Sequence, residues 1–203
     1  MIKVNIEQGS EAWFAERCGR ITATRIAIMM SGEATKGYKD LVADLAGEII
    51  TGEVEESYSN AIMERGTELE PYARELYCQI FNIEVEEVGF IVHEKYPEWM
   101  GVSPDGLPNG GGLEIKCPLR KTHIGYIEKN ILPNEYKWQI QGSLFTTGLP
   151  HWDFMSYYPN MKPFILRVYP DLRMHSEIET RLLKTIELIK EKINNYNLYD
   201  HLK

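Results

Sequence analysis

Apolar residues recur with helical spacing in several stretches of the chain. In residues 38–51, Leu41, Leu45 and Ile49 follow one another at intervals of four, so that they share one face of a helix. A similar stripe from about residue 171 to about residue 198 predicts a long amphipathic C-terminal helix. Less regular patterns predict four more helices, at residues 11–18, 24–31, about 60–81 and 135–148.

Residue types at the ends of these stretches support the helices. Ser10, and either Thr22 or Thr24, can cap a helix N-terminus because the side-chain oxygen accepts a hydrogen bond from a free backbone amide. Gly148 can end the helix before it in a left-handed conformation. Pro71 lacks an amide donor and clashes with the preceding turn, so it either bends its helix or begins the second half of it.

After residue 83 the period changes to two, which is typical of β-strands. The order of helices, three strands, helix, two strands and helix predicts an α/β or α+β fold with one central mixed sheet flanked by helices. The predicted strands lie at residues 83–94, 98–106, 111–118, 151–159 and 164–170. Residues 52–59 have no period and are interpreted as a solvated loop.

The composition fits a single soluble domain over residues 1–203, of which 43% are hydrophobic. The sequence contains no run of about 18 apolar residues and no secretory leader, so we expect a cytoplasmic protein without a membrane partner. The three cysteines are far apart and are interpreted as reduced thiols. The net charge of −8 means that any site for a phosphate must be local.

One strand carries an acid and a base on the same face. Side chains alternate across a strand, so Glu114 and Lys116 lie opposite the apolar residues between and beside them. Asp105 lies in a Ser-Pro-Asp-Gly turn that can bring its carboxylate beside Glu114. Two such carboxylates, with the Ile115 carbonyl, suit Mg²⁺ or Mn²⁺, and Lys116 could orient a water molecule. The alternative is a common surface turn followed by a chance acid-x-Lys triplet.

A cluster of arginines provides a local positive charge. Arg17, Arg20 and Arg25 flank the predicted helix N-terminus at Thr22 to Thr24, where free backbone amides favour an anion. From these residues alone, a basic coat of Arg17 and Arg20 on a helix and turn is the favoured interpretation. The histidines at 93, 123, 151 and 175 lack metal-ligand spacing, and the tryptophans lie in apolar patterns, so packing roles are expected for both.

Four stretches in order resemble one nuclease family. They are "IEQGSEAWFAERCGRITAT", "RGTELEPYAR", "SPDGL…GGLEIKCP" and "YKWQIQGSLFTTG", and they span about residues 5 to 150. The sequence resembles the PD-(D/E)XK nucleases and, among them, the phage lambda exonuclease type of viral recombination nuclease. The resemblance implies the restriction-endonuclease-like core of that superfamily, with residues 1–82 completing the site for a DNA end.

The resemblance also implies an activity. It implies a Mg²⁺-dependent enzyme that degrades one strand of linear double-stranded DNA in the 5′-to-3′ direction during phage-type homologous recombination. The implied partners are double-stranded DNA ends, two further copies of the chain in a trimeric ring, and a single-strand annealing protein. The implied location is the cytoplasm of a bacterial host, with a phage or prophage origin.

The resemblance assigns roles to individual residues. Asp105, Glu114, Lys116 and Gln139 match catalytic positions, and Glu70 and Ile115 join the two acids as metal ligands. Arg17 matches the residue that grips a 5′-phosphate, and Thr24, Arg20 and Arg25 lie in the same DNA-binding segment. Two alternatives stay open: a different PD-(D/E)XK nuclease, such as a single-strand or structure-specific endonuclease, and a DNA clamp that does not cut.

Overall fold

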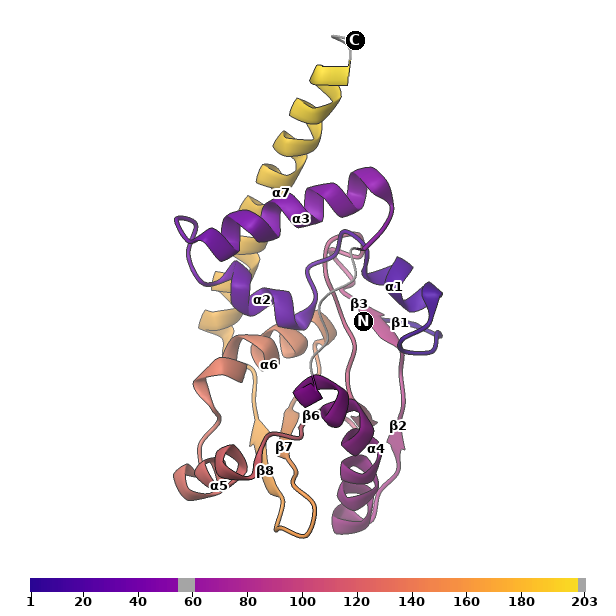
Figure 1. The fold of residues 1–203 in the computed structure, drawn as a ribbon, viewed down its shortest axis with the longest axis vertical. Coiled ribbons are helices and arrows are strands. Elements are labelled where there is room, and N and C mark those ends of the chain that lie inside the picture. The colour runs from indigo at the N-terminus through magenta and orange to yellow at the C-terminus, as the bar shows by residue number, and fades with distance from the viewer. Residues whose placement is uncertain (55–60, 201–203) are drawn as a thin grey trace.

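The computed structural model describes residues 1–54 and 61–200 of the chain (Figure 1). Most of the loop predicted at 52–59, and the predicted helix start at Asn60, lie outside these residues. The helices are α1 (Glu11–Arg17), α2 (Ala23–Met29), α3 (Lys36–Thr51), α4 (Ala61–Phe81), α5 (Arg120–Lys129), α6 (Asn134–Thr147) and α7 (Leu172–Asp200). The strands are β1 (Ile2–Val4), β2 (Val85–Glu86), β3 (Phe90–Val92), β4 (Gly101–Val102), β5 (Leu107–Pro108), β6 (Gly112–Lys116), β7 (Trp152–Ser156) and β8 (Phe164–Val168).

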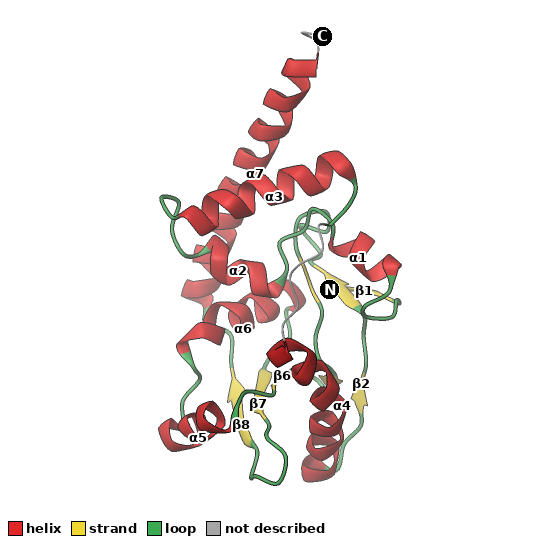
Figure 2. Ribbon diagram, in the orientation of Figure 1, coloured by secondary structure: helices red, strands yellow, loops and turns green. Residues whose placement is uncertain are grey.

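The mixture of helices and strands confirms the predicted α+β class, but the sheet is divided (Figure 2). One three-stranded sheet has the order β6-β7-β8, with β6 parallel to β7 and β7 antiparallel to β8. A second has the order β1-β3-β4, and β2 pairs with β5 alone. A single antiparallel bridge between Gly106 and Leu113 joins the turn before β6 to that strand.

Helices cover both faces of the β6-β7-β8 sheet. On one face, Ala73 and Tyr77 of α4 pack against Leu113 and Ile115 of β6. On the other face, α5 and α6 contribute to a second apolar cluster with β7 and β8. A third cluster joins α2, α3 and α7, and α7 extends beyond α2 and α3 as far as Asp200 (Figure 1). None of the described helices is both long and apolar enough to cross a bilayer.

Most helix ends follow the local chemistry of the sequence. The Ser10 side chain caps α1 by accepting from the Trp13 amide, and Gly148 ends α6 at a φ of 69°. Thr22 is the N-cap residue of α2, but its side chain forms no capping hydrogen bond. The helix α4 continues through Pro71.

Three elements were not predicted: β1, α5 and the two-residue strand β5, which lies between two of the predicted strands. Strand β1 is only three residues long and pairs with β3. Helix α5 is largely polar and buries only His123 and Tyr126, so its sequence lacks the apolar stripe by which the other helices were recognised.

Candidate active site

Strand β6 places its acid and base as the alternation predicted. Leu113, Ile115 and Cys117 are buried toward α4, whereas Glu114 and Lys116 face α6. The Lys116 Nζ lies 2.5 Å from the Glu114 Oε1, and the Gln139 Nε2 donates a hydrogen bond to the same oxygen at 2.5 Å. Three of the four predicted catalytic side chains are therefore in direct contact.

Asp105 reaches the same point from the edge of β6. Its amide donates to the Leu113 carbonyl at 3.1 Å, and its Oδ2 accepts from the Ile115 amide at 2.6 Å. The predicted antiparallel pairing of the Asp105 segment with β6 is confirmed, but it consists of one bridge, between Gly106 and Leu113. A side chain at Gly106 would begin 2.2 Å from the Val85 Cγ1, so any larger residue would require Val85 to move.

The two carboxylates and the ammonium group act on one another. Burial, and next the charge of Glu114, raise the pKa of Asp105 well above its usual range, although Lys116 acts in the opposite direction. Burial also lowers the pKa of Lys116, but Glu114 and Asp105 together outweigh it and the net change is upward. Lys116 is therefore positively charged at neutral pH, beside two carboxyl groups that it cannot both neutralise.

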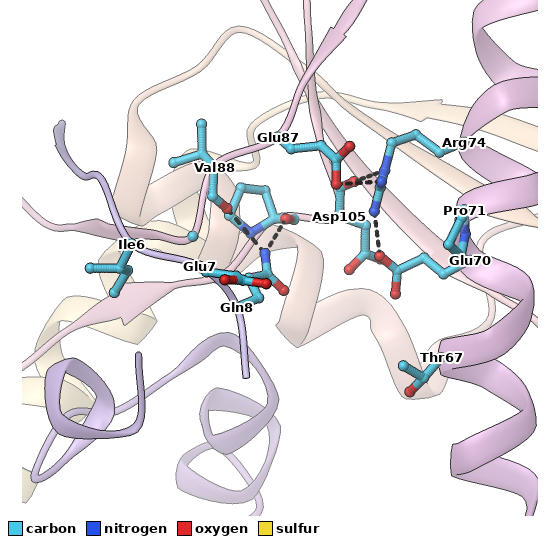
Figure 3. Close-up of a pocket in the computed structure, with 12 residues that line it drawn as sticks. Ile6, Glu7, Gln8, Thr67, Glu70, Pro71, Arg74, Glu87, Val88 and Asp105 are labelled. Atoms are coloured by element: carbon cyan, nitrogen blue, oxygen red, sulfur yellow. Dashed lines mark hydrogen bonds and ion pairs between the residues drawn. The ribbon is translucent and has the colours of Figure 1, made fainter. Parts of the chain in front are cut away.

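Glu70 and Arg74 of α4 form the other side of the site (Figure 3). Arg74 bonds with its Nη2 to the Glu70 Oε1 at 2.7 Å and pairs through its Nη1 with the Glu87 Oε2 at 2.6 Å. Its Nε donates to the Asp105 carbonyl at 2.7 Å. Burial raises the pKa of Glu70, with Arg74 acting against it. These residues line a cleft of about 500 Å³ that extends to Gln8 in the N-terminal segment.

The oxygen donors at this site fit a hard divalent cation. Asp105, Glu114 and Glu70 supply carboxylates, and Ile115, whose amide bonds to Asp105, follows Glu114 in β6 and could add its carbonyl. In the part of the chain that the structure describes, no group of three or more His, Cys, Asp or Glu side chains is arranged to hold a metal ion. Glu114 is bonded to Lys116 and Glu70 to Arg74. Burial raises the pKa of Asp105 most, and the second cause is repulsion from Glu114, which a cation would relieve.

The three predicted phosphate-binding arginines differ in their partners. Arg25 forms an ion pair with the buried Glu48, and Arg20 pairs with Glu16 and also donates to the Pro97 carbonyl. Among the described residues, Arg17 forms no ion pair with a carboxylate. Arg20 and Arg25 therefore have structural roles, whereas the charge of Arg17 is available for an anion.

Arg17 is held by neutral groups. Its guanidinium lies 4.1 Å from the centroid of the Trp13 ring, and its Nη1 donates to the Ser103 hydroxyl at 3.3 Å. Burial, and next the charge of Arg25, lower the pKa of Arg17 to about 10, so it stays charged at neutral pH. Thr24 is exposed, and its hydroxyl lies 3.4 Å from that of Thr22.

Two of the histidines, His93 and His123, have packing roles, as expected from their spacing. His123 is fully buried, with one ring nitrogen 2.8 Å from the Ser156 hydroxyl and the other 3.0 Å from the Lys162 carbonyl. The Nδ1 of His93 accepts from the amides of Lys95 and Tyr96.

Two side chains at the site were given no role by the sequence analysis. Arg74 follows Glu70 by four residues, and this helical spacing of opposite charges was a usable signal. Gln8 bonds to backbone carbonyls of Val88 and Pro104, and nothing in the sequence specifies such contacts. Both residues lie within stretches that carry the family resemblance.

A mixed sheet between helices, with an aspartate and a Glu-x-Lys pair meeting at the edge of one strand, defines the PD-(D/E)XK class of folds. Within this class, the chain belongs to the family described as the YqaJ-like viral recombinase domain, which matches residues 12–150. The resemblance to the lambda exonuclease type is thereby confirmed.

Solved structures agree with this assignment. The alkaline exonuclease LHK-Exo from Laribacter hongkongensis is 35% identical, with a TM-score of 0.86 over 95% of this chain and 98% of its own. The same protein in complex with dAMP gives a TM-score of 0.87 over the same shares. A phage-related exonuclease from Haemophilus somnus 129PT, 13% identical over 87% of this chain and 96% of its own, has a TM-score of 0.65 and shares the fold.

A curated relative is much longer than the chain. The uncharacterized protein R354 of Acanthamoeba polyphaga mimivirus is 27% identical in an alignment of 163 residues that covers 73% of this chain. The match spans only 29% of that relative.

Proposed function

We propose that this protein is a Mg²⁺-dependent exonuclease that degrades one strand of linear double-stranded DNA from its 5′ end. The observation that carries the proposal is the meeting of Asp105, Glu114 and Lys116 at the edge of β6, beside an open cleft. Membership of a viral recombinase family, and the likeness to an alkaline exonuclease that was solved with dAMP, support the same activity. Mn²⁺ would suit the same oxygen donors.

The side chains divide the work of phosphodiester hydrolysis between them. Asp105, Glu114 and the Ile115 carbonyl, with Glu70 on the opposite wall, would hold the cation. When bound, the cation supplies Lewis acidity toward a phosphoryl oxygen and lowers the pKa of a water ligand. Lys116 holds its proton and stabilises negative charge that develops on the phosphate. Gln139 fixes the Glu114 carboxylate through its amide donor.

Arg17 is the group proposed to hold the terminal 5′-phosphate. A guanidinium presents its donors in a fork that matches phosphate oxygens, and this one has no carboxylate partner among the described residues. Arg25 and Arg20 hold the surrounding segment through Glu48 and the Pro97 carbonyl. Thr24 offers an exposed hydroxyl in the same segment.

The cellular setting is part of the proposal. The activity fits phage-type homologous recombination in the cytoplasm of a bacterial host, in which a recessed 5′ strand leaves single-stranded DNA for an annealing protein. A ring of three subunits would keep the enzyme on its DNA. Sedimentation of the purified protein, with and without duplex DNA, measures the proposed assembly directly.

The test is digestion of matched DNA substrates. Purified protein is incubated with Mg²⁺ and a linear duplex, the same duplex with phosphorothioate linkages at both 5′ ends or at both 3′ ends, and the same sequence as a closed circle. We expect nucleotide release from the unblocked and the 3′-blocked duplex, and little from the 5′-blocked duplex or the circle. Glu114→Gln should abolish release, and the exposed Glu187→Gln on α7 serves as its control.

The rival activities give other patterns. Cleavage of the circle identifies an endonuclease of the same superfamily. Block of digestion by the 3′ linkages alone reverses the proposed direction. Binding of duplex DNA without Mg²⁺-dependent release identifies a clamp that does not cut.

A further inference from the structure

Side chains from two remote segments hold the backbone on either side of Asp105 (Figure 3). The Gln8 Nε2 donates to the Pro104 carbonyl at 3.0 Å, and the Arg74 Nε donates to the Asp105 carbonyl at 2.7 Å. The peptide groups before and after the Asp105 Cα are thus both anchored by side chains. One of these comes from the N-terminal segment and the other from α4.

The carboxylate itself is fixed to β6. The Asp105 amide donates to the Leu113 carbonyl, and the Asp105 Oδ2 accepts from the Ile115 amide. A residue on a turn usually has more freedom than one in a strand. With its amide, its carbonyl and its carboxylate all bonded, and the preceding carbonyl held by Gln8, Asp105 has its position set almost as firmly as that of Glu114.

The chain is built so that Gln8 can reach this turn. Gly9 has a φ of +83°, which favours glycine and turns the chain away immediately after Gln8. At Gly89, a side chain would begin 1.9 Å from the Ile6 carbonyl oxygen, so only glycine lets the N-terminal segment lie this close. Gln8 then bridges the Val88 and Pro104 carbonyls with one amide group.

Arg74 has a second connection to the site. The same guanidinium that holds the Asp105 carbonyl bonds to Glu70 and pairs with Glu87. Its planar fork therefore relates the position of α4 to that of the turn. Neither Gln8 nor Arg74 contacts the carboxylate oxygens of Asp105 in the described contacts.

We propose that Gln8 and Arg74 are positioning residues that fix the two peptide groups flanking Asp105, so that its carboxylate faces that of Glu114 for a divalent cation. This inference rests on the proposed function, because it assumes that these carboxylates bind a metal. It gives a role to the Gln-Gly pair of the N-terminal stretch, which the proposed chemistry does not use. Outer groups that orient metal ligands typically contribute about 10- to 100-fold to affinity or activity.

The first test measures metal affinity without DNA. Mn²⁺ is titrated calorimetrically into wild type, Gln8→Ala and Gln8→Glu, of which the last keeps the side-chain size but presents an oxygen to the two carbonyls. We expect about 10-fold weaker Mn²⁺ binding in both variants. Because Gln8 is exposed, the melting temperature in EDTA should stay close to that of wild type. Gln79→Ala is the control, since the Gln79 Nε2 donates to Glu75 on the surface of α4.

A second measurement separates positioning from general damage. In an Asp105→Asn background, Gln8→Ala should weaken Mn²⁺ binding no further, because the residue through which it acts is already changed. Arg74→Lys keeps the charge but loses the fork, and it should weaken Mn²⁺ binding by a similar factor. The matched control is Arg181→Lys, which alters an arginine of α7 that pairs with Glu33.

The outcomes distinguish this proposal from the proposed function. If wild type binds Mn²⁺ and Gln8→Ala weakens the binding, but wild type releases no nucleotides, the nuclease assignment fails and the positioning role stands. If wild type digests DNA and Gln8→Ala has unchanged Mn²⁺ affinity and Mg²⁺ dependence, the positioning role is overturned alone. Absence of Mn²⁺ binding by wild type also overturns it.

Discussion

Two glutamates are buried against a basic side chain, and they differ in what else surrounds them. Glu48 is 6% exposed, pairs with Arg25 and accepts from the Gly19 amide at 2.8 Å. Glu114 is 3% exposed, pairs with Lys116 and accepts from Gln139. By burial and by hydrogen bonding the two sites are alike.

The difference is the neighbouring charge. At Glu48 one carboxylate pairs with the Arg25 guanidinium and joins α2 to α3, and the further charge that acts on this pair, that of Arg17, is positive. At Glu114 a second carboxylate, Asp105, faces the same ammonium group and has its pKa raised. A buried ion pair alone therefore does not mark a reactive site in this protein. The surplus of negative charge is what distinguishes the candidate site at Glu114, because it favours a cation or a proton.

The largest effect is expected from removing the basic side chain that pairs with Glu114. Lys116→Met should lower the rate of nucleotide release by about 10²- to 10⁴-fold, because the charge that stabilises the developing phosphate charge is lost. Single-turnover digestion of linear duplex DNA measures this rate. Lys95→Met is the control, since Lys95 pairs with Glu179 away from the site. A loss of less than about tenfold would contradict the role of Lys116.

Removing the basic side chain that pairs with Glu48 should instead lower stability. Arg25→Met leaves Glu48 buried without its partner, and we expect the free energy of unfolding to fall by about 2–3 kcal/mol, with some relief from solvent at the partly exposed Arg25. Urea denaturation measures the change. Lys36→Met, at an exposed pair with Asp40, should change it by less than about 0.5 kcal/mol. An equal decrease in the free energy of unfolding of both variants would show that the buried pair stabilises the protein no more than the exposed pair does.

Arg17 tests whether the arginine without a carboxylate partner binds phosphate. Arg17→Ala should reduce the preference for 5′-phosphorylated over 5′-hydroxyl ends by about tenfold, because charge-assisted hydrogen bonds to the phosphate are lost. Competition between the two substrates in one reaction measures the preference. Arg173→Ala, at an exposed arginine near the start of α7, is the control. An equal loss on both kinds of end would assign Arg17 to general binding.

The smallest effect concerns repulsion between the carboxylates. Because the folded-state pKa of Asp105 is raised, the metal-free protein loses stability as the pH rises from the usual carboxyl pKa through that higher value. Asp105→Asn should therefore raise the free energy of unfolding in EDTA at neutral pH by about 1 kcal/mol. The gain should vanish below about pH 4. Denaturation at several pH values measures it, with the exposed Asp44→Asn as control; a variant less stable than wild type at neutral pH would contradict the repulsion.

The sequence predicted those parts of the site that depend on local periodicity. Alternation along β6 put Glu114 and Lys116 on one face, and the Pro-Asp-Gly turn put Asp105 nearby. The parallel pairing of β6 with β7 was not evident, because it depends on a strand that follows about 36 residues later, after two helices. The anchoring of Asp105 by Gln8 was also hidden. A side chain that bonds to distant backbone carbonyls leaves no periodic pattern.

For the arginine cluster, the sequence could not predict which side chains have partners inside the protein. Sequence proximity grouped Arg17, Arg20 and Arg25 in one basic cluster, but the fold gives two of them internal partners. Glu48, which pairs with Arg25, lies on α3 and could be assigned to it only after the helices had packed.

The most direct test of the surplus-charge account is a titration of Mg²⁺ into metal-stripped protein, with nucleotide release from linear duplex DNA as the signal. The account predicts no release in EDTA, saturable release as Mg²⁺ is added, and none at any Mg²⁺ concentration in Glu114→Gln. Release in EDTA, or a Glu114→Gln variant that responds to Mg²⁺ as wild type does, would contradict it.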